Sequence, residues 1–206
     1  MLKVNLYFDE IDFYRYLPQT DCRECGLTTC KEFLGNLKRR EIRLADCPHL
    51  SAHMIYAFDV ALNAQQIIPE IELMQLPVIG KPGLVEFNIP DKHSPLLISG
   101  NSELTQLALS AILATTVKPF YVLFVDILGH TIDMAMIYGV LNEVRIRDAI
   151  EESHITDMID HREIVIPGFA GSLHQEIERL TGLSVNVGPI CCGELPLYFG
   201  EDWIPP

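Results

Sequence analysis

Four cysteines near the start of the chain constrain its structure more than any other feature. They are spaced Cys22-x2-Cys25-x4-Cys30-x16-Cys47, and the last is followed by Pro48. Thiolates that converge from one short loop and from a later turn of the chain are typical of an iron–sulfur cluster. Structural zinc sites also use four cysteines, but usually as two close C-x2-C pairs, and this segment has one such pair. The spacing therefore favours an iron–sulfur cluster, with zinc as the alternative and disulfides as a more distant third.

A helix is expected to begin at this loop. Thr29 and Glu32 have the spacing of an N-terminal capping box, which predicts a helix over about residues 31–40. Cys30 would then lie at a helix N-terminus, where the helix dipole stabilises a thiolate and a negatively charged cluster.

Composition describes a folded globular chain. Its 206 residues are 49% hydrophobic and 21% charged, enough for one ordinary domain and a small one. The net charge of −13 disfavours nucleic acid and anionic membrane surfaces as partners. Charged residues interrupt the first apolar run, and no stretch reaches the length of a membrane span. Because clustered free thiols survive in a reducing compartment, we expect a cytoplasmic protein.

Composition and hydrophobic periodicity change along the chain and predict three regions. Residues 1–66 are expected to form a helical domain that holds the cluster, because apolar residues recur there at helical spacing. Residues 67–94 are rich in proline and glycine, with a short strand signal at 84–89, and are expected to be a connector. Residues 95–206 are expected to form the second domain.

In the second domain, short apolar strands alternate with amphipathic helices. Strands are expected at residues 96–99, 120–127, 163–167 and 184–187, and helices at residues 103–114, 143–160 and 171–181. This alternation is the signature of a parallel sheet covered on both faces. The fold class is therefore α/β: a small helical metal domain with a Rossmann-like, parallel-sheet domain.

Glycine-bearing turns follow several of the expected strands, at residues 99–101, 126–129, 167–168 and 188–189. Open parallel sheets bind ligands beyond the carboxyl ends of their strands, where glycine lets the backbone approach a cofactor. The alternative is that these glycines only turn the chain. The sequence contains no Gly-x-Gly-x-x-Gly, no Walker A motif and no Gly-x-Ser-x-Gly, so the usual nucleotide and hydrolase signatures are absent.

Six segments together resemble a known family. Residues 17–30 and 44–50 are similar to the N-terminal [4Fe-4S] domain of the large (gamma) subunit of the corrinoid iron–sulfur protein, part of the acetyl-CoA decarbonylase/synthase (CO dehydrogenase/acetyl-CoA synthase) system. Residues 95–105, the strand that ends at Asp126, and residues 161–169 and 187–189 are similar to the C-terminal corrinoid domain of that subunit. The resemblance covers about three quarters of the chain, in the same order.

The resemblance implies a methyl carrier rather than a stand-alone enzyme. Cobalt of a corrinoid (cobalamin) would accept a methyl group as Co(I) and pass it on, while the [4Fe-4S] cluster returns inactive Co(II) to Co(I). Methyltransferase proteins and a low-potential electron donor would be the partners in anaerobic one-carbon metabolism. The residues implied at the two cofactors are, for the cluster, Cys22, Cys25, Cys30 and Cys47, and, for the corrinoid, Gly100, Asn101, Thr105, Gly168, Phe169, Gly188 and Pro189.

The chain also departs from this family. The gamma subunit has a TIM barrel between its end domains, whereas this chain has only the connector, so the small partner subunit of the family is not implied. Cys191 and Cys192 replace polar residues near the last turn; they are read as buried packing thiols or as an additional metal feature. Two alternatives stay open: an iron–sulfur electron-transfer protein whose second domain binds no corrinoid, and a zinc-knot interaction module.

Overall fold

The structure, a computed structural model, describes residues 6–69 and 77–206. A five-stranded sheet has the strand order β1-β3-β2-β4-β5. The strands are β1 (Gly83–Phe87), β2 (Leu96–Gly100), β3 (Phe120–Val125), β4 (Glu163–Ile166) and β5 (Ser184–Val187). Strands β2 to β5 run parallel, and β1 pairs antiparallel with β3 at one edge. The α/β class is confirmed, with an antiparallel edge strand added to the parallel sheet.

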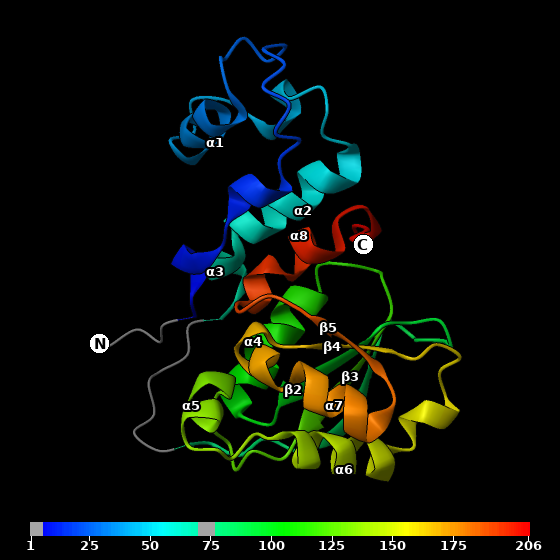
Figure 1. Cartoon of the computed structure of the whole chain (residues 1–206). Coiled ribbons are helices and arrows are strands. Elements are labelled where there is room, and N and C mark those ends of the chain that lie inside the picture. The colour runs from blue at the N-terminus through cyan, green and yellow to red at the C-terminus, as the bar shows by residue number, and fades with distance from the viewer. Residues whose placement is uncertain (1–5, 70–76) are drawn as a thin grey trace.

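Helices cover both faces of the sheet (Figure 1). On one side lie α2 (Ala52–Leu62), α3 (Ala64–Ile67), α4 (Glu103–Leu113) and α8 (Leu195–Phe199). On the other lie α5 (Ile132–Ile137), α6 (Glu143–Ser153) and α7 (His174–Thr181). Helix α1 (Cys30–Lys38) lies with the cysteine loop at the end of the molecule away from the sheet (Figure 1).

Alternation along the central strands divides the apolar side chains between two cores. Strand β3 contributes Phe120, Val122 and Phe124 to one core and Tyr121, Leu123 and Val125 to the other. All six are buried, as expected for a strand that is covered on both faces. The period-2 pattern thus supports two helical layers.

The first core extends from the sheet into the N-terminal region. It contains Phe33 of α1 and Phe58 of α2 together with Trp203 near the C-terminus, all of them 2% exposed or less. Helix α2 packs against α8, and the loop before α2 joins them to the cysteine segment (Figure 1). Residues from both of the expected domains therefore share one hydrophobic core.

Several boundaries differ from the expected ones for local reasons. Helix α6 ends at Ser153 rather than near residue 160, because His154 adopts a left-handed φ of 54°. Residues Gly168–Leu173 form a 3-10 helix, and α7 follows at His174. The sequence did not predict α5 or α8, which are too short to show a clear periodic pattern.

The connector contains part of the sheet. Its strand signal at residues 84–89 corresponds to β1, which pairs with β3. Residues 70–76 of the expected connector lie outside the described residues. The boundaries at 66 and 94 stay predictions. In the ranges that the structure describes, every helix is too short or too polar to cross a bilayer.

Candidate cofactor sites

The four cysteines of the N-terminal region line one small cavity. Cys22 and Cys25 lie in the loop before α1, Cys30 is the first residue of α1, and Cys47 follows a 3-10 helix at Leu44–Asp46. All four are free thiols, and Cys47 is buried. The folded chain thus brings together the four positions that the spacing singles out.

Local hydrogen bonds set the position of Cys30. Asp21 accepts a hydrogen bond from the Cys30 amide at 2.7 Å, and the Thr29 hydroxyl oxygen accepts one from the Glu32 amide at 3.0 Å. The Glu32 carboxylate accepts from the amide and hydroxyl of Thr28, not from Thr29 as a strict capping box requires. Helix α1 therefore starts at the expected place, with the reciprocal bond moved by one residue.

Backbone turns in the loop bring its first two thiols to the same side. Asp21, Arg23 and Gly26 have left-handed φ values of 48°, 64° and 81°. Such conformations reverse the chain direction within a few residues. Burial raises the pKa of the Cys47 thiol, a hydrogen bond from the His49 backbone partly offsets this, and the nearby thiols raise the pKa further. A bound cationic metal centre offsets that cost, so the donor set fits a thiolate-bound cluster or metal.

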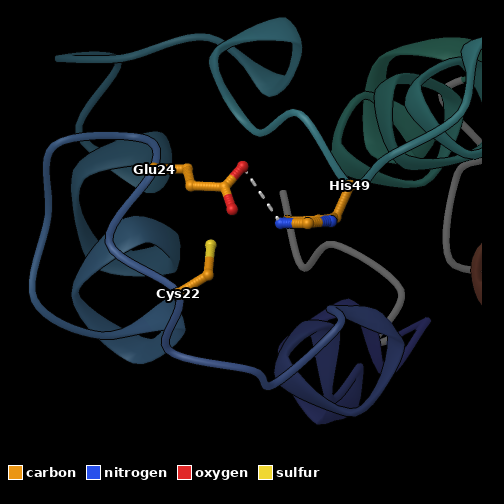
Figure 2. Close-up of side chains that lie close together, drawn as sticks. All are labelled: Cys22, Glu24 and His49. Atoms are coloured by element: carbon orange, nitrogen blue, oxygen red, sulfur yellow. Dashed lines mark ion pairs between the residues drawn. The ribbon is translucent and has the colours of Figure 1, made fainter.

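Three side chains in and beside this loop, which include Cys22, form another group that could hold a metal ion (Figure 2). Ligand atoms of Cys22, Glu24 and His49 lie within 4.8 Å of one another. The Nε2 of His49 is 3.4 Å from an oxygen of Glu24. Sequence reasoning did not single out Glu24 or His49, although each stands two residues after a loop cysteine. The loop therefore also offers a mixed sulfur, oxygen and nitrogen donor set of the kind that zinc accepts.

The larger cavity lies at the carboxyl ends of the parallel strands. Chain order reverses between β2 and β4, because β3 lies on one side of β2 and β4 on the other. A cavity of about 1000 Å³ opens beside this point. It is lined mostly by apolar side chains, with Ser99 of β2, Ile166 of β4 and Gly188 after β5 among them. This is the place where open α/β sheets bind ligands, and the volume suits a large one.

Four of the seven residues implied for the corrinoid line this cavity: Thr105, Phe169, Gly188 and Pro189. The other three, Gly100, Asn101 and Gly168, are not among the lining residues. Gly188 approaches β4 closely, because a Cβ there would lie 2.8 Å from Val165 Cγ1. Each glycine-bearing turn thus contributes at least one residue to the cavity lining, although not every glycine of these turns does.

Asn101 has a structural role beneath the cavity. It is fully buried, and its Oδ1 accepts hydrogen bonds from the amides of Ile127 at 2.9 Å and Gly129 at 3.3 Å. Its Nδ2 donates to Asp126 at 3.0 Å and to the Gly80 carbonyl. The side chain therefore fixes the turn after β3 against the end of β2.

Gly168 and Gly100 each allow close packing of the surrounding chain. The Gly168 amide donates to the Pro189 carbonyl at 2.9 Å, and a Cβ at Gly168 would lie 2.9 Å from the amide nitrogen of Ile190. A Cβ at Gly100 would overlap the side chain of Ile127. Both glycines let neighbouring turns approach each other at the cavity edge.

Tyr7 and Asp133 also line the cavity, and sequence reasoning missed their pairing. The Tyr7 hydroxyl donates to Asp133 Oδ2 at 2.7 Å, and its ring contacts Phe169 edge-on at 4.9 Å. The hydrogen bond to Asp133 raises the pKa of Tyr7 to about 12. No sequence signal could have found a contact between residues so far apart in the chain.

Two family models match this chain, one over the cysteine segment and one over most of the remainder. The fold combines a segment with four clustered cysteines and an α/β domain with a large cavity. A family model described as "CO dehydrogenase/acetyl-CoA synthase delta subunit" matches residues 54–198, and one described as "Putative Fe-S cluster" matches residues 17–49. The chain belongs to the CO dehydrogenase/acetyl-CoA synthase delta subunit family, which confirms the resemblance at the family level.

Curated relatives are acetyl-CoA decarbonylase/synthase complex gamma subunits. The protein from Methanothermobacter thermautotrophicus is 31% identical over 143 residues, which is 66% of this chain and 31% of the relative. The one from Methanopyrus kandleri is 30% identical over 122 residues, 59% of this chain and 26% of the relative. The one from Methanocaldococcus jannaschii is 25% identical over 206 residues, 94% of this chain and 40% of the relative. The chain thus spans well under half the length of these relatives.

Proposed function

We propose that the chain is a methyl carrier that holds a [4Fe-4S] cluster in the cysteine loop and a corrinoid in the large cavity. The observation that carries the proposal is the presence, in a member of this family, of a four-thiol loop and of a cavity of about 1000 Å³ at the reversal point of the sheet. When bound, the corrinoid would supply methyl transfer and the cluster single electrons.

The chain's own residues would bind and shield these groups. The four cysteines provide the thiolates, and Asp21 and Thr29 hold Cys30 at the start of α1. At the other site, Thr105 and the Gly188–Pro189 turn present a polar group and accessible backbone to the cavity. The apolar lining excludes water from whatever fills it.

Partners follow from the same proposal. The names of the relatives describe subunits of a complex, so we propose protein partners: methyltransferase proteins and a low-potential electron donor. Six free cysteines agree with a reducing compartment, which we propose is the cytoplasm.

Retention of hydroxocobalamin tests the corrinoid site. In Thr105→Arg a long charged side chain enters the cavity, so the variant should lose bound cobalt after gel filtration. Gln106→Arg is the matched control, because Gln106 is the next residue of α4 and does not line the cavity. Equal retention in both variants would show that corrinoid binds elsewhere or not at all.

One observation favours a second candidate, a zinc-binding interaction module. The group of Cys22, Glu24 and His49 offers one sulfur, one oxygen and one nitrogen donor in close proximity. Metal analysis after anaerobic purification separates the two: iron with sulfide supports the cluster, and zinc without sulfide supports the module.

A further inference from the structure

Two adjacent thiols open onto the large cavity. Cys191 and Cys192 both line it, with Cys191 buried and Cys192 partly exposed. Both are free thiols. They are separate from the cysteine loop, whose thiols line the small cavity.

The turn that carries this pair is held in place by the N-terminal region. It enters a 3-10 helix at Cys192–Glu194, and a Cβ at Gly193 would lie 2.9 Å from the Cβ of Ala64 in α3. The buried Glu194 carboxylate accepts a hydrogen bond from the Tyr16 hydroxyl at 2.8 Å. The thiols are therefore presented to the cavity from a fixed backbone, as a binding group should be.

The two thiols interact with each other. A hydrogen bond from Cys192 and the amides of Gly193 and Glu194 lower the pKa of Cys191, whereas burial and the charge of Glu194 raise it, and the net pKa is lowered. The same pairing, together with burial, raises the pKa of Cys192. The two side chains are therefore within hydrogen-bonding reach of each other, so one metal centre could contact both sulfurs.

We propose that Cys191 and Cys192 form a dithiol site for a thiophilic metal centre that enters the large cavity. Soft thiolate donors select such metals, and two sulfurs on one rigid turn can act together. Adjacent Cα atoms are about 3.8 Å apart, which is shorter than the spacing of ordinary disulfides, so closure of the pair to a disulfide is disfavoured. The pair thus stays available as a donor.

Two sources could supply the metal centre: the cobalt of a bound corrinoid, or a free soft cation. The first rests on the proposed function, and the second does not. In either case the step is a ligand exchange: a sulfur–metal bond forms, a metal–water bond breaks, and the thiol proton passes to solvent. No electrons are transferred, so no additional reactant is needed.

The cobalt arm of the test uses protein reconstituted with iron and sulfide, so that the loop thiols are occupied. Hydroxocobalamin is added and the absorbance spectrum is recorded after removal of unbound material. We expect a thiolate–cobalt spectrum in the wild type and its loss in Cys191→Ser/Cys192→Ser. His130→Gln is the control, because His130 also lines the cavity and offers a nitrogen donor.

The cadmium arm measures Cd²⁺ binding by equilibrium dialysis on the same reconstituted proteins. The wild type should bind about one Cd²⁺ per chain more than the double variant, and the His130→Gln protein should match the wild type. Because both proteins carry the cysteine loop, its contribution cancels in the difference.

The combined outcomes decide both proposals. A cysteine-dependent cobalt spectrum identifies corrinoid as the source, whereas cadmium binding alone identifies a free soft cation. If cobalt is retained but neither arm depends on the pair, the dithiol site is refuted and the proposed function stands. If no cobalt is retained, the proposed function fails, and the cadmium arm alone decides the dithiol site. Dependence on His130 instead of the cysteines would also overturn the inference.

Discussion

Cys22 is a residue whose removal separates the two proposed cofactor sites. It lines the small cavity with the other loop thiols and does not line the large one. The reconstituted wild type should hold about four irons per chain. We expect Cys22→Ser to lose most of this iron, while hydroxocobalamin retention stays at the wild-type level. Iron and cobalt analysis of the same samples measures both. Cobalt loss in parallel with iron would mean that the sites depend on each other.

Asp133 is expected to make stability depend on pH in the acid range. Burial raises the pKa of Asp133, but hydrogen bonds from the hydroxyls of Thr131 and Tyr7 outweigh it, and the net pKa is lowered. A carboxyl whose folded pKa is lowered stabilises the fold above its unfolded pKa of about 4. That contribution is lost as the pH falls through the folded value.

Asp133→Asn tests this dependence. At pH 7 the variant should be less stable by about 1 kcal/mol, a modest value because Asp133 is only partly buried. The difference should shrink toward zero as the pH falls below 4, since the wild-type carboxyl then also becomes neutral. Urea denaturation of both proteins at several pH values measures it. A pH-independent difference would assign the loss to packing instead of charge.

The turn between β3 and α5 depends on a glycine at the cavity edge. Gly129 has a left-handed φ of 74°, and a Cβ there would lie 2.9 Å from backbone atoms of Val78 and Ile79. Gly139, at the other end of α5, has a similar φ of 67° with no heavy atom within 4 Å of the added Cβ. The two positions therefore separate conformational strain from a backbone clash.

Alanine at each position gives the comparison. Gly139→Ala should cost about 1 kcal/mol, from the left-handed conformation alone. Gly129→Ala should cost more, because backbone must also move, and should weaken cobalamin retention since Gly129 lines the cavity. Thermal denaturation and gel filtration measure the two effects. Equal costs would mean that the turn after β3 relaxes freely.

Elements with a strong local signal were predicted well from the sequence. Strand β5 has the expected bounds, and the Ser102 side chain caps the helix expected from residue 103 by accepting from the Thr105 amide. The sequence missed α5 and α8, because helices of six and five residues owe their stability to tertiary contacts. It also misplaced the end of α6, which a left-handed histidine determines.

At the scale of the whole molecule, the shared core predicts that the N-terminal helices and the sheet unfold together. Phe58 of α2 is fully buried in the core that also contains Trp203, the single tryptophan. Phe58→Ala should lower the free energy of unfolding by roughly 3 to 5 kcal/mol, through lost burial and a cavity. Trp203 fluorescence during urea denaturation reports on the C-terminal side of this core.

The control for this prediction is Ile137→Ala. Ile137 is 73% exposed, so its removal should change the free energy of unfolding by less than about 0.5 kcal/mol. A Trp203 transition unchanged in Phe58→Ala would show that α2 belongs to an independently folding unit, as the predicted boundary at residue 66 implies.

The sequence predicted the type and location of the candidate sites better than their individual side-chain contacts. Cysteine spacing pointed to the four loop thiols, and glycine turns pointed to the carboxyl edge where the cavity lies. The sequence could not show that Asn101 faces backbone amides instead of the cavity, or that Tyr7 reaches Asp133. Such contacts depend on how distant segments pack, and no local pattern encodes them.

The most direct test of the central proposal, two cofactors on one chain, is an anaerobic absorbance spectrum with iron, sulfide and cobalt analysis. The wild-type protein would be reconstituted with iron and sulfide, incubated with hydroxocobalamin and freed of unbound material by gel filtration. The proposal predicts about four irons with matching sulfide and about one cobalt per chain. Four irons without cobalt, or zinc in place of iron, would contradict it.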